Sequence, residues 1–193
     1  MCSLSPYHAP VTSLWEPLTA LPPVPVPKNM KAAVLVPLYE NAGRLRVVLT
    51  RRPDHMPTHP GDVVFPGGMM EPHDDGPVDT AMREACEEIG LPRGNVVEIL
   101  GGLQPTHTRS AETMIVPMIV PVVARIERPE EFTPQPAEVE SIIEPTLDEL
   151  LPDDNWRTSE GAAGRTVWFY EFPEGILWGA TASMVRELLA YFR

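Results

Sequence analysis

Apolar and β-branched residues occur along the chain in short runs that are separated by turn residues. Their alternation predicts strands over residues 32–40, 44–52, 62–68, 96–105, 114–126 and 165–172. Two other segments repeat apolar residues at helical spacing, over residues 77–88 and 180–192, and Gly90 stands where the first of them would end. Because strands and helices do not alternate regularly, we expect a mixed α/β (α+β) sandwich, with a mixed β-sheet between helices, rather than a doubly wound parallel fold.

Proline adds two expectations to this pattern. Pro117 and Pro121 interrupt the run over residues 114–126, which predicts an edge strand or a bulge because proline has no N–H for the ladder. Residues 1–28 are rich in proline, a composition that favours extended backbone over a packed element. At about 100–200 residues per domain, the chain of 193 residues is then one domain, 29–193, preceded by an N-terminal arm, 1–28.

The charge and the cysteines limit the partners and the location. The chain has 15 Lys and Arg residues against 27 Asp and Glu residues, a formal net charge of −12, which argues against nucleic acid or an anionic membrane as a partner. Cys2 and Cys86 form neither a disulfide framework nor zinc spacing, and the N-terminus lacks the basic segment of a secretory signal, so we expect a reducing, cytoplasmic location. Because soluble proteins that assemble most often form two-fold dimers, a homodimer is the expected oligomer.

Three glutamates in the predicted helix suggest a site. Glu84, Glu87 and Glu88 stand at i, i+3 and i+4, so a helix places their carboxylates on one face. Such like charges destabilise a helix unless a divalent cation turns the cluster into a set of oxygen ligands. Three glutamates alone are more often a solvated acidic surface. The Gly67-Gly68 turn upstream favours a metal site, because glycine lets a backbone carbonyl approach the same ion closely.

The helix sequence carries a family signature. Residues 83–91, Arg-Glu-Ala-Cys-Glu-Glu-Ile-Gly-Leu, match the second half of the Nudix box, and Gly68 and Asp74 match its first half with one additional residue before Arg83. The chain therefore resembles the Nudix hydrolases. Residues 48–68 further resemble the motif of the coenzyme A diphosphatase branch, which tolerates the longer loop. Val48, Pro53 and Pro57 depart from that motif, and Pro57 replaces an arginine suited to a phosphate.

This resemblance implies roles for particular residues. It implies Mg²⁺ or Mn²⁺ held by Glu84, Glu87, Glu88 and the Gly67 carbonyl, with Glu87 and Glu88 counted among the catalytic residues. Arg83 would hold the glutamates by hydrogen bonds, or would be an ordinary ion-pair partner of Glu87.

Later segments supply the remaining candidates. Glu138 follows a second landmark of the branch, residues 132–136, and is the candidate general base, with a solvated loop glutamate as the alternative. Arg51, Arg52 and Arg109 are candidate phosphate ligands, although each alone is more often a surface charge. Cys86, between the glutamates, is expected to pack into the core and not to act as a nucleophile.

The implied reaction is hydrolysis of a diphosphate bond. For the coenzyme A branch, coenzyme A or acyl-coenzyme A would give phosphopantetheine and adenosine 3′,5′-bisphosphate. The departure at Pro57 leaves ADP-ribose or another nucleoside diphosphate derivative as an alternative substrate. A non-catalytic nucleotide-binding module is the third possibility, and the presence of Glu84, Glu87 and Glu88 disfavours it.

Overall fold

The computed structural model describes residues 13–107, 118–161, 164 and 166–193. Its strands are β1 (Met30–Asn41), β2 (Arg44–Val47), β3 (Leu49–Arg51), β4 (Asp62–Val64), β5 (Gly67–Met69), β6 (Val96–Gly102), β7 (Thr106–His107), β8 (Met118–Ile126), β9 (Ser141–Ile143), β10 (Arg157–Glu160), β11 (Thr166–Glu171) and β12 (Ile176–Trp178). Its α-helices are α1 (Pro77–Ile89), α2 (Leu147–Leu150) and α3 (Gly179–Ala190), and 3₁₀ turns cover Glu16–Ala20, Arg93–Asn95 and Asp153–Asn155.

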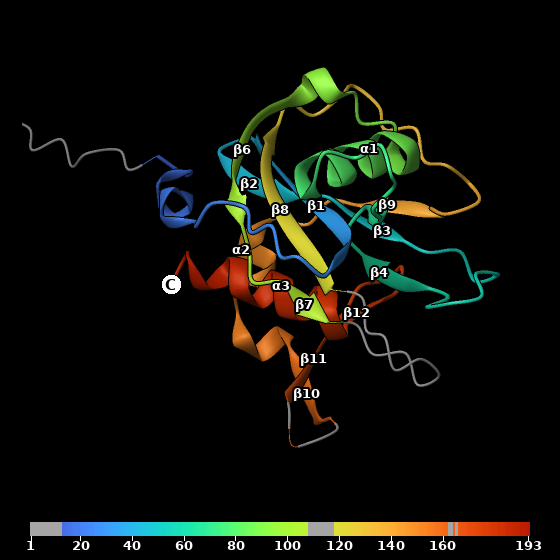
Figure 1. Cartoon of the computed structure of the whole chain (residues 1–193). Helices are drawn as coiled ribbons and strands as arrows, with labels where there is room; N and C mark the ends of the chain where they lie inside the picture. The colour runs from blue at the N-terminus through green and yellow to red at the C-terminus, as the bar shows by residue number, and fades with distance from the viewer. Residues whose placement is uncertain (1–12, 108–117, 162–163, 165) are drawn as a thin grey trace, which may run out of the picture.

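The strands form two sheets of six (Figure 1). The first has the order β2-β1-β8-β6, with β5 paired to β1 and β7 paired to β8; β1 and β8 run parallel. The second has the order β10-β11-β12-β4-β3-β9, in which β12 and β4 run parallel. The other registered pairs are antiparallel, which confirms the mixed α/β fold expected from the sequence.

Two of the predicted strands are each divided between the two sheets, so their prediction as single strands is wrong. The run over residues 44–52 leaves the first sheet as β2 and enters the second as β3, and Val48 lies at the change. The run over residues 62–68 crosses back, from β4 in the second sheet to β5 in the first. An apolar run looks the same whichever partner its backbone bonds, so the change of sheet has no signal in the sequence.

The structure confirms the expected helix α1 and corrects the expectation for Pro121. Helix α1 is confirmed and ends at Gly90, whose φ of 64° is left-handed. Pro121 lies in β8, an interior strand, so the edge expectation is wrong there; the proline falls between the residues that pair with β6 and those that pair with β7. Pro117 lies outside the described residues. Helix α2 was not expected from apolar spacing, although the capping box formed by Thr146 and Glu149 is visible in the sequence.

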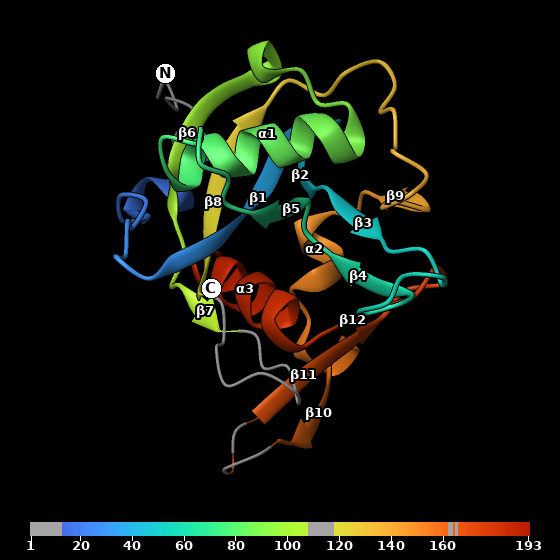
Figure 2. The ribbon, with the colours of Figure 1, turned by 45° about the vertical axis from the view of Figure 1, so that its right-hand side comes forward.

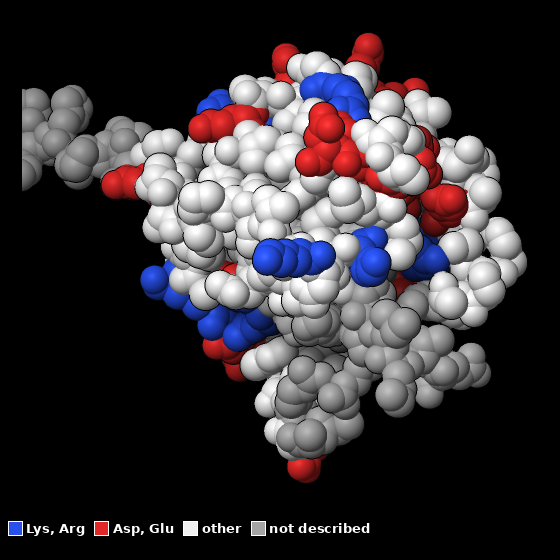
Figure 3. All heavy atoms as spheres, viewed as in Figure 1, with Lys and Arg blue, Asp and Glu red and all other residues white. Residues whose placement is uncertain are grey.

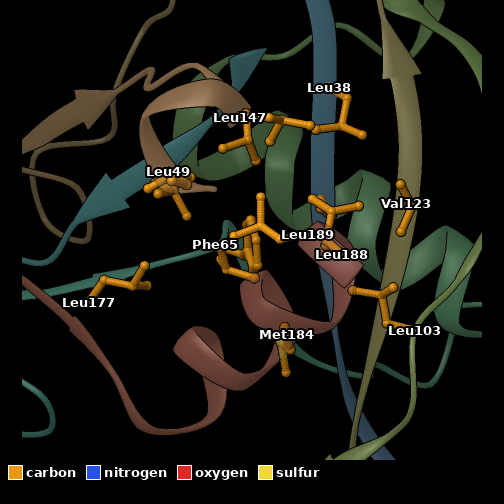
Figure 4. Close-up of a cluster of buried hydrophobic side chains, with 14 of the residues drawn as sticks. Leu38, Leu49, Phe65, Leu103, Val123, Leu147, Leu177, Met184, Leu188 and Leu189 are labelled. Atoms are coloured by element: carbon orange, nitrogen blue, oxygen red, sulfur yellow. The ribbon is translucent and has the colours of Figure 1, made fainter. Parts of the chain in front are cut away.

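The buried apolar residues form two clusters, one on each side of the first sheet. The larger lies between the sheets and α3 (Figure 4), and Leu18 and Leu21 of the N-terminal segment pack into it. The smaller lies under α1, which contributes Ala81, Ala85 and Ile89 (Figure 2). Cys86 is exposed, which corrects its expected burial: the apolar face of α1 includes the position of Glu88 and excludes that of Cys86. No helix in the described part of the chain has the length and apolar character needed to cross a membrane.

Candidate active site

Helix α1 and strand β5 position the three glutamates. Glu88 is buried at 6% exposure, the side chain of Glu84 is 13% exposed, and that of Glu87 is 59% exposed. The helix therefore does not present three equivalent carboxylates to solvent: two are enclosed against β5 and one is outside. Figure 3 shows acidic side chains gathered over the region that α1 occupies in Figure 1, with separate basic side chains below them.

Glu88 is the most perturbed of these acids. Its Oε2 accepts a hydrogen bond from the Gly67 N–H at 3.0 Å. Burial raises the pKa of Glu88 to about 8, and the nearby charges of Glu138 and Glu84 act in the same direction, while the Gly67 hydrogen bond and the charge of Arg52 oppose the shift. Burial also raises the pKa of Glu84. The burial of these two carboxyl groups thus disfavours their negative charge until a cation compensates it.

The two glycines of β5 are pressed against different neighbours. Gly67, with a φ of +158°, lies beside β1 so closely that a Cβ would stand 2.5 Å from the Ala33 oxygen and the Val34 Cα. A Cβ on Gly68 would stand 2.5 Å from Glu84 Oε1. A side chain at position 67 would therefore collide with the backbone of β1, which cannot move away. A side chain at position 68 would collide with the Glu84 carboxylate, which can rotate.

This difference gives a matched pair of substitutions. Gly67→Ala should destabilise the fold by about 2 kcal/mol or more, because its clash is with backbone that cannot move away. Gly68→Ala should leave the thermal midpoint nearly unchanged but displace Glu84, weakening Mn²⁺ binding by about 10- to 100-fold. Thermal melts and calorimetric Mn²⁺ titration measure both; equal loss of stability in the two variants would contradict the assignment.

Arg83 joins the helix to the loop before it. Its Nε and Nη2 donate to the two oxygens of buried Asp74, each at 3.0 Å, and Nη2 also donates to the Met69 carbonyl at 2.9 Å. Its Nη1 donates to Glu84 at 3.0 Å and to Glu87 at 3.1 Å. Arg83 therefore both holds two of the glutamates by hydrogen bonds and forms the i,i+4 ion pair with Glu87, the two arrangements considered from the sequence. The Arg83 hydrogen bonds hold the pKa of Asp74 well below its usual range, although burial opposes this, and Asp74 raises that of Arg83.

Glu138 is brought to the glutamates by a loop that covers the end of α1. The Thr133 N–H donates to the Ile89 carbonyl at 3.0 Å, and the Gln135 N–H donates to the Glu88 carbonyl at 2.8 Å, so the loop satisfies open carbonyls of the helix. Glu138 itself is exposed, and its charge acts on both Glu84 and Glu88. Its role as a base stays a prediction.

The candidate phosphate ligands have different surroundings. Arg51 is engaged by Glu140 and by Asp54, at 2.7 Å, and its contacts tie strand β3 to two loops. Among the described residues, the Arg52 side chain donates one long hydrogen bond, to the Thr58 carbonyl at 3.4 Å, and its charge reaches Glu88. Arg52 is thus the better placed of the two for an anion near the glutamates. Arg109 lies outside the described residues.

The comparison with known proteins decides the family. Residues 29–163 match the NUDIX domain. The chain belongs to the Nudix hydrolase family. This match confirms the family and the enzyme class that residues 83–91 indicate. The matched residues include helix α1 and the loop that carries Glu138.

Several Nudix relatives are similar over most of this chain. Nudix hydrolase 22, chloroplastic, of Arabidopsis thaliana is 36% identical over 80% of this chain, which spans about half, 53%, of that relative's length. The Nudix hydrolase NudL of Photorhabdus laumondii is 32% identical, covering 87% of this chain and 89% of the relative. Among solved structures, a C. elegans Ap4A hydrolase in a binary complex matches with a TM-score of 0.55, 17% identity and coverage of 84% and 97%, which shows the fold alone.

The acidic residues of this Nudix hydrolase fit a divalent cation by their chemistry. Across the described residues, no three His, Cys, Asp or Glu side chains are already gathered around one point. Glu88, however, forms no ion pair with any described cationic side chain. Gly67 and Gly68, which form the start of strand β5 and not the turn expected from the sequence, lie directly against Glu88 and Glu84. Carboxylate and carbonyl oxygens are the ligands that Mg²⁺ and Mn²⁺ prefer. Glu87 would join them by rotating its exposed side chain away from Arg83.

Proposed function

We propose that this Nudix hydrolase cleaves the diphosphate bond of coenzyme A or acyl-coenzyme A, releasing phosphopantetheine and adenosine 3′,5′-bisphosphate. The observation that supports hydrolysis is the enclosed pair Glu84 and Glu88 against Gly67 and Gly68 of β5, with Arg52 and Glu138 beside them. The choice of coenzyme A rests on the resemblance of residues 48–68 to the motif of that branch.

The chain's own residues supply binding, orientation and proton transfer. Glu84, Glu87, Glu88 and the Gly67 carbonyl would hold Mg²⁺ or Mn²⁺, which when bound neutralises phosphate oxygens and lowers the pKa of a water molecule. Arg52 would contact a phosphate oxygen of the diphosphate. Glu138, exposed to solvent and close in charge to Glu84 and Glu88, would accept the proton of the attacking water.

ADP-ribose or another nucleoside diphosphate derivative is the second candidate. Pro57 supports it, because the coenzyme A motif has an arginine at that position and the 3′-phosphate of coenzyme A needs a cationic partner. In the structure Pro57 is exposed on the loop between β3 and β4, which also carries Arg52.

A product assay separates these substrates. Coenzyme A, acetyl-coenzyme A and ADP-ribose are supplied together with Mn²⁺ or Mg²⁺, and products are identified by mass spectrometry. We expect metal-dependent phosphopantetheine, and a loss of about 10²-fold or more in Glu87→Gln, a substitution at an exposed side chain that leaves the fold intact. AMP and ribose phosphate alone would reject coenzyme A but keep the hydrolysis. No turnover together with thermal stabilisation by a nucleotide would favour the binding module.

A further inference from the structure

Two aromatic rings stack against each other on the face of the second sheet opposite the core, and one of them, Trp178, is exposed. Phe169 of β11 pairs with Trp178 of β12 across the ladder, and their rings are parallel within 4°, with centroids 6.2 Å apart. Trp178 is 39% exposed, and the ring of His59 lies 6.0 Å from it. Leu177, the neighbour of Trp178 along the strand, is fully buried against the core, so Trp178 stands on the opposite face.

This face of the sheet continues to the glutamate site. Thr50 of β3 pairs with Val64 of β4, and because Val63 pairs with Leu177, Trp178 stands next to Val64 on the same face. Arg52 follows Thr50 by two residues, so alternation places it on this face as well, and its charge reaches Glu88. From the glutamates the surface therefore runs past Arg52 and Val64 to Trp178 and then Phe169.

The spacing of this surface fits one half of a nucleotide. Neighbouring strands are about 4.8 Å apart, so Trp178 lies about 10 Å across the sheet from the strand that leads to Arg52. That is about the distance that a ribose puts between a base and its diphosphate. An exposed aromatic ring beside a charged site is typical of ligand-binding surfaces, and a flat ring suits a planar partner better than a flexible chain.

We propose that the exposed ring of Trp178, supported by Phe169 stacked against it, forms a platform for the nucleobase of the substrate. The inference rests on the proposed function, which places the diphosphate at Glu84 and Glu88, and it adds the residues that recognise the nucleoside half. The base stacks on the exposed ring of Trp178, the phosphates extend toward Arg52, and the other half of the substrate leaves the platform on the far side of the metal site.

The test measures nucleotide binding without turnover. The full chain is titrated calorimetrically with AMP and with adenosine 3′,5′-bisphosphate in EDTA, and separately with phosphopantetheine. Trp178→Leu removes the ring but keeps apolar volume, and it should weaken nucleotide binding by about 5- to 30-fold. Trp178→Phe should retain most of the affinity. Ile176→Ala, at an exposed position two residues away on the same strand, is the matched control and should bind like the wild type.

Catalytic and spectroscopic measurements complete the test. Trp178→Leu should raise KM for coenzyme A by a similar factor with kcat little changed, and nucleotide should quench tryptophan fluorescence of the wild type more than of Trp178→Phe. If Trp178→Leu does not fold, Phe169→Leu replaces it. Unchanged nucleotide affinity in the variant, or weakened phosphopantetheine binding instead, would overturn the platform. Nucleotide binding that depends on Trp178 in a protein that turns over no diphosphate would support the platform and reject the proposed hydrolysis; neither binding nor turnover would reject both.

Discussion

Replacing Glu88 by glutamine should stop diphosphate hydrolysis and at the same time stabilise the metal-free protein. Hydrolysis should fall by about 10²- to 10⁴-fold, because an amide is a poor metal ligand and cannot take up a proton. Stability should rise by about 1–3 kcal/mol at pH 9, because the amide removes a buried charge while its oxygen still accepts the Gly67 hydrogen bond. An active site that is strained until its cation binds would produce both effects together.

The pH dependence follows from the direction of the shift. The pKa of Glu88 is raised to about 8 in the folded protein, from an ordinary value of 4.5. Between these values the folded protein keeps the proton that the unfolded chain has lost, so metal-free stability should decrease as pH rises through this range. Glu88→Gln should abolish most of that slope.

Chemical denaturation in EDTA at several pH values measures this prediction. Glu98→Gln, an exposed glutamate on β6, is the control and should follow the wild type throughout. Mn²⁺ should stabilise the wild type most at high pH, where Glu88 is ionised, and Glu88→Gln only weakly. Loss of stability at pH 9 in Glu88→Gln, or full activity of that variant, would show that Glu88 is not a metal ligand whose buried charge destabilises the metal-free protein.

The second large effect is expected at Asp74. Asp74→Ala should destabilise the protein by about 3–5 kcal/mol, because it leaves the Arg83 guanidinium buried without its bidentate partner. Asp74→Asn, which keeps an acceptor oxygen, should cost about 1–2 kcal/mol. Arg83 would also lose its fixed orientation toward Glu84 and Glu87, so the surviving activity should fall even where the variant is folded.

Denaturation curves at neutral and acidic pH check the Asp74 prediction. The pKa of Asp74 is lowered in the folded state, so its contribution is present above the ordinary carboxyl pKa and is lost as pH falls below it. Asp74→Asn should therefore be less sensitive to acid than the wild type. Asp75→Ala is the control, at an exposed neighbour. Equal destabilisation by Asp75→Ala and Asp74→Ala would mean that the loop conformation, and not the ion pair between Asp74 and Arg83, is the source of the stability.

The local patterns of the sequence predicted what depends on near neighbours. Helical spacing and Gly90 indicated α1 and its end, and the residues that specify the Nudix box indicated the family by their types and spacing alone. These features could be predicted because a helix, its cap and a box of fixed spacing involve residues that are close along the chain. The short strand β9 lacked such a local signal, since its pairing partner β3 is remote along the chain. Strands β10 and β12 pair with β11 in successive hairpins, but with four and three residues they are too short to show a clear alternation.

What only the tertiary structure decided is which neighbours the site residues have. In the sequence, Glu84, Glu87 and Glu88 are equivalent acids, yet packing against β5 buries Glu88 and leaves Glu87 exposed. The two crossings between sheets, which no apolar pattern records, bring Gly67 to Glu88 and align Trp178 beside Val64. A sequence determines each residue's chemistry and its local backbone preference, whereas burial and charge proximity, which set the pKa of Glu88, arise only when segments far apart in the chain pack together.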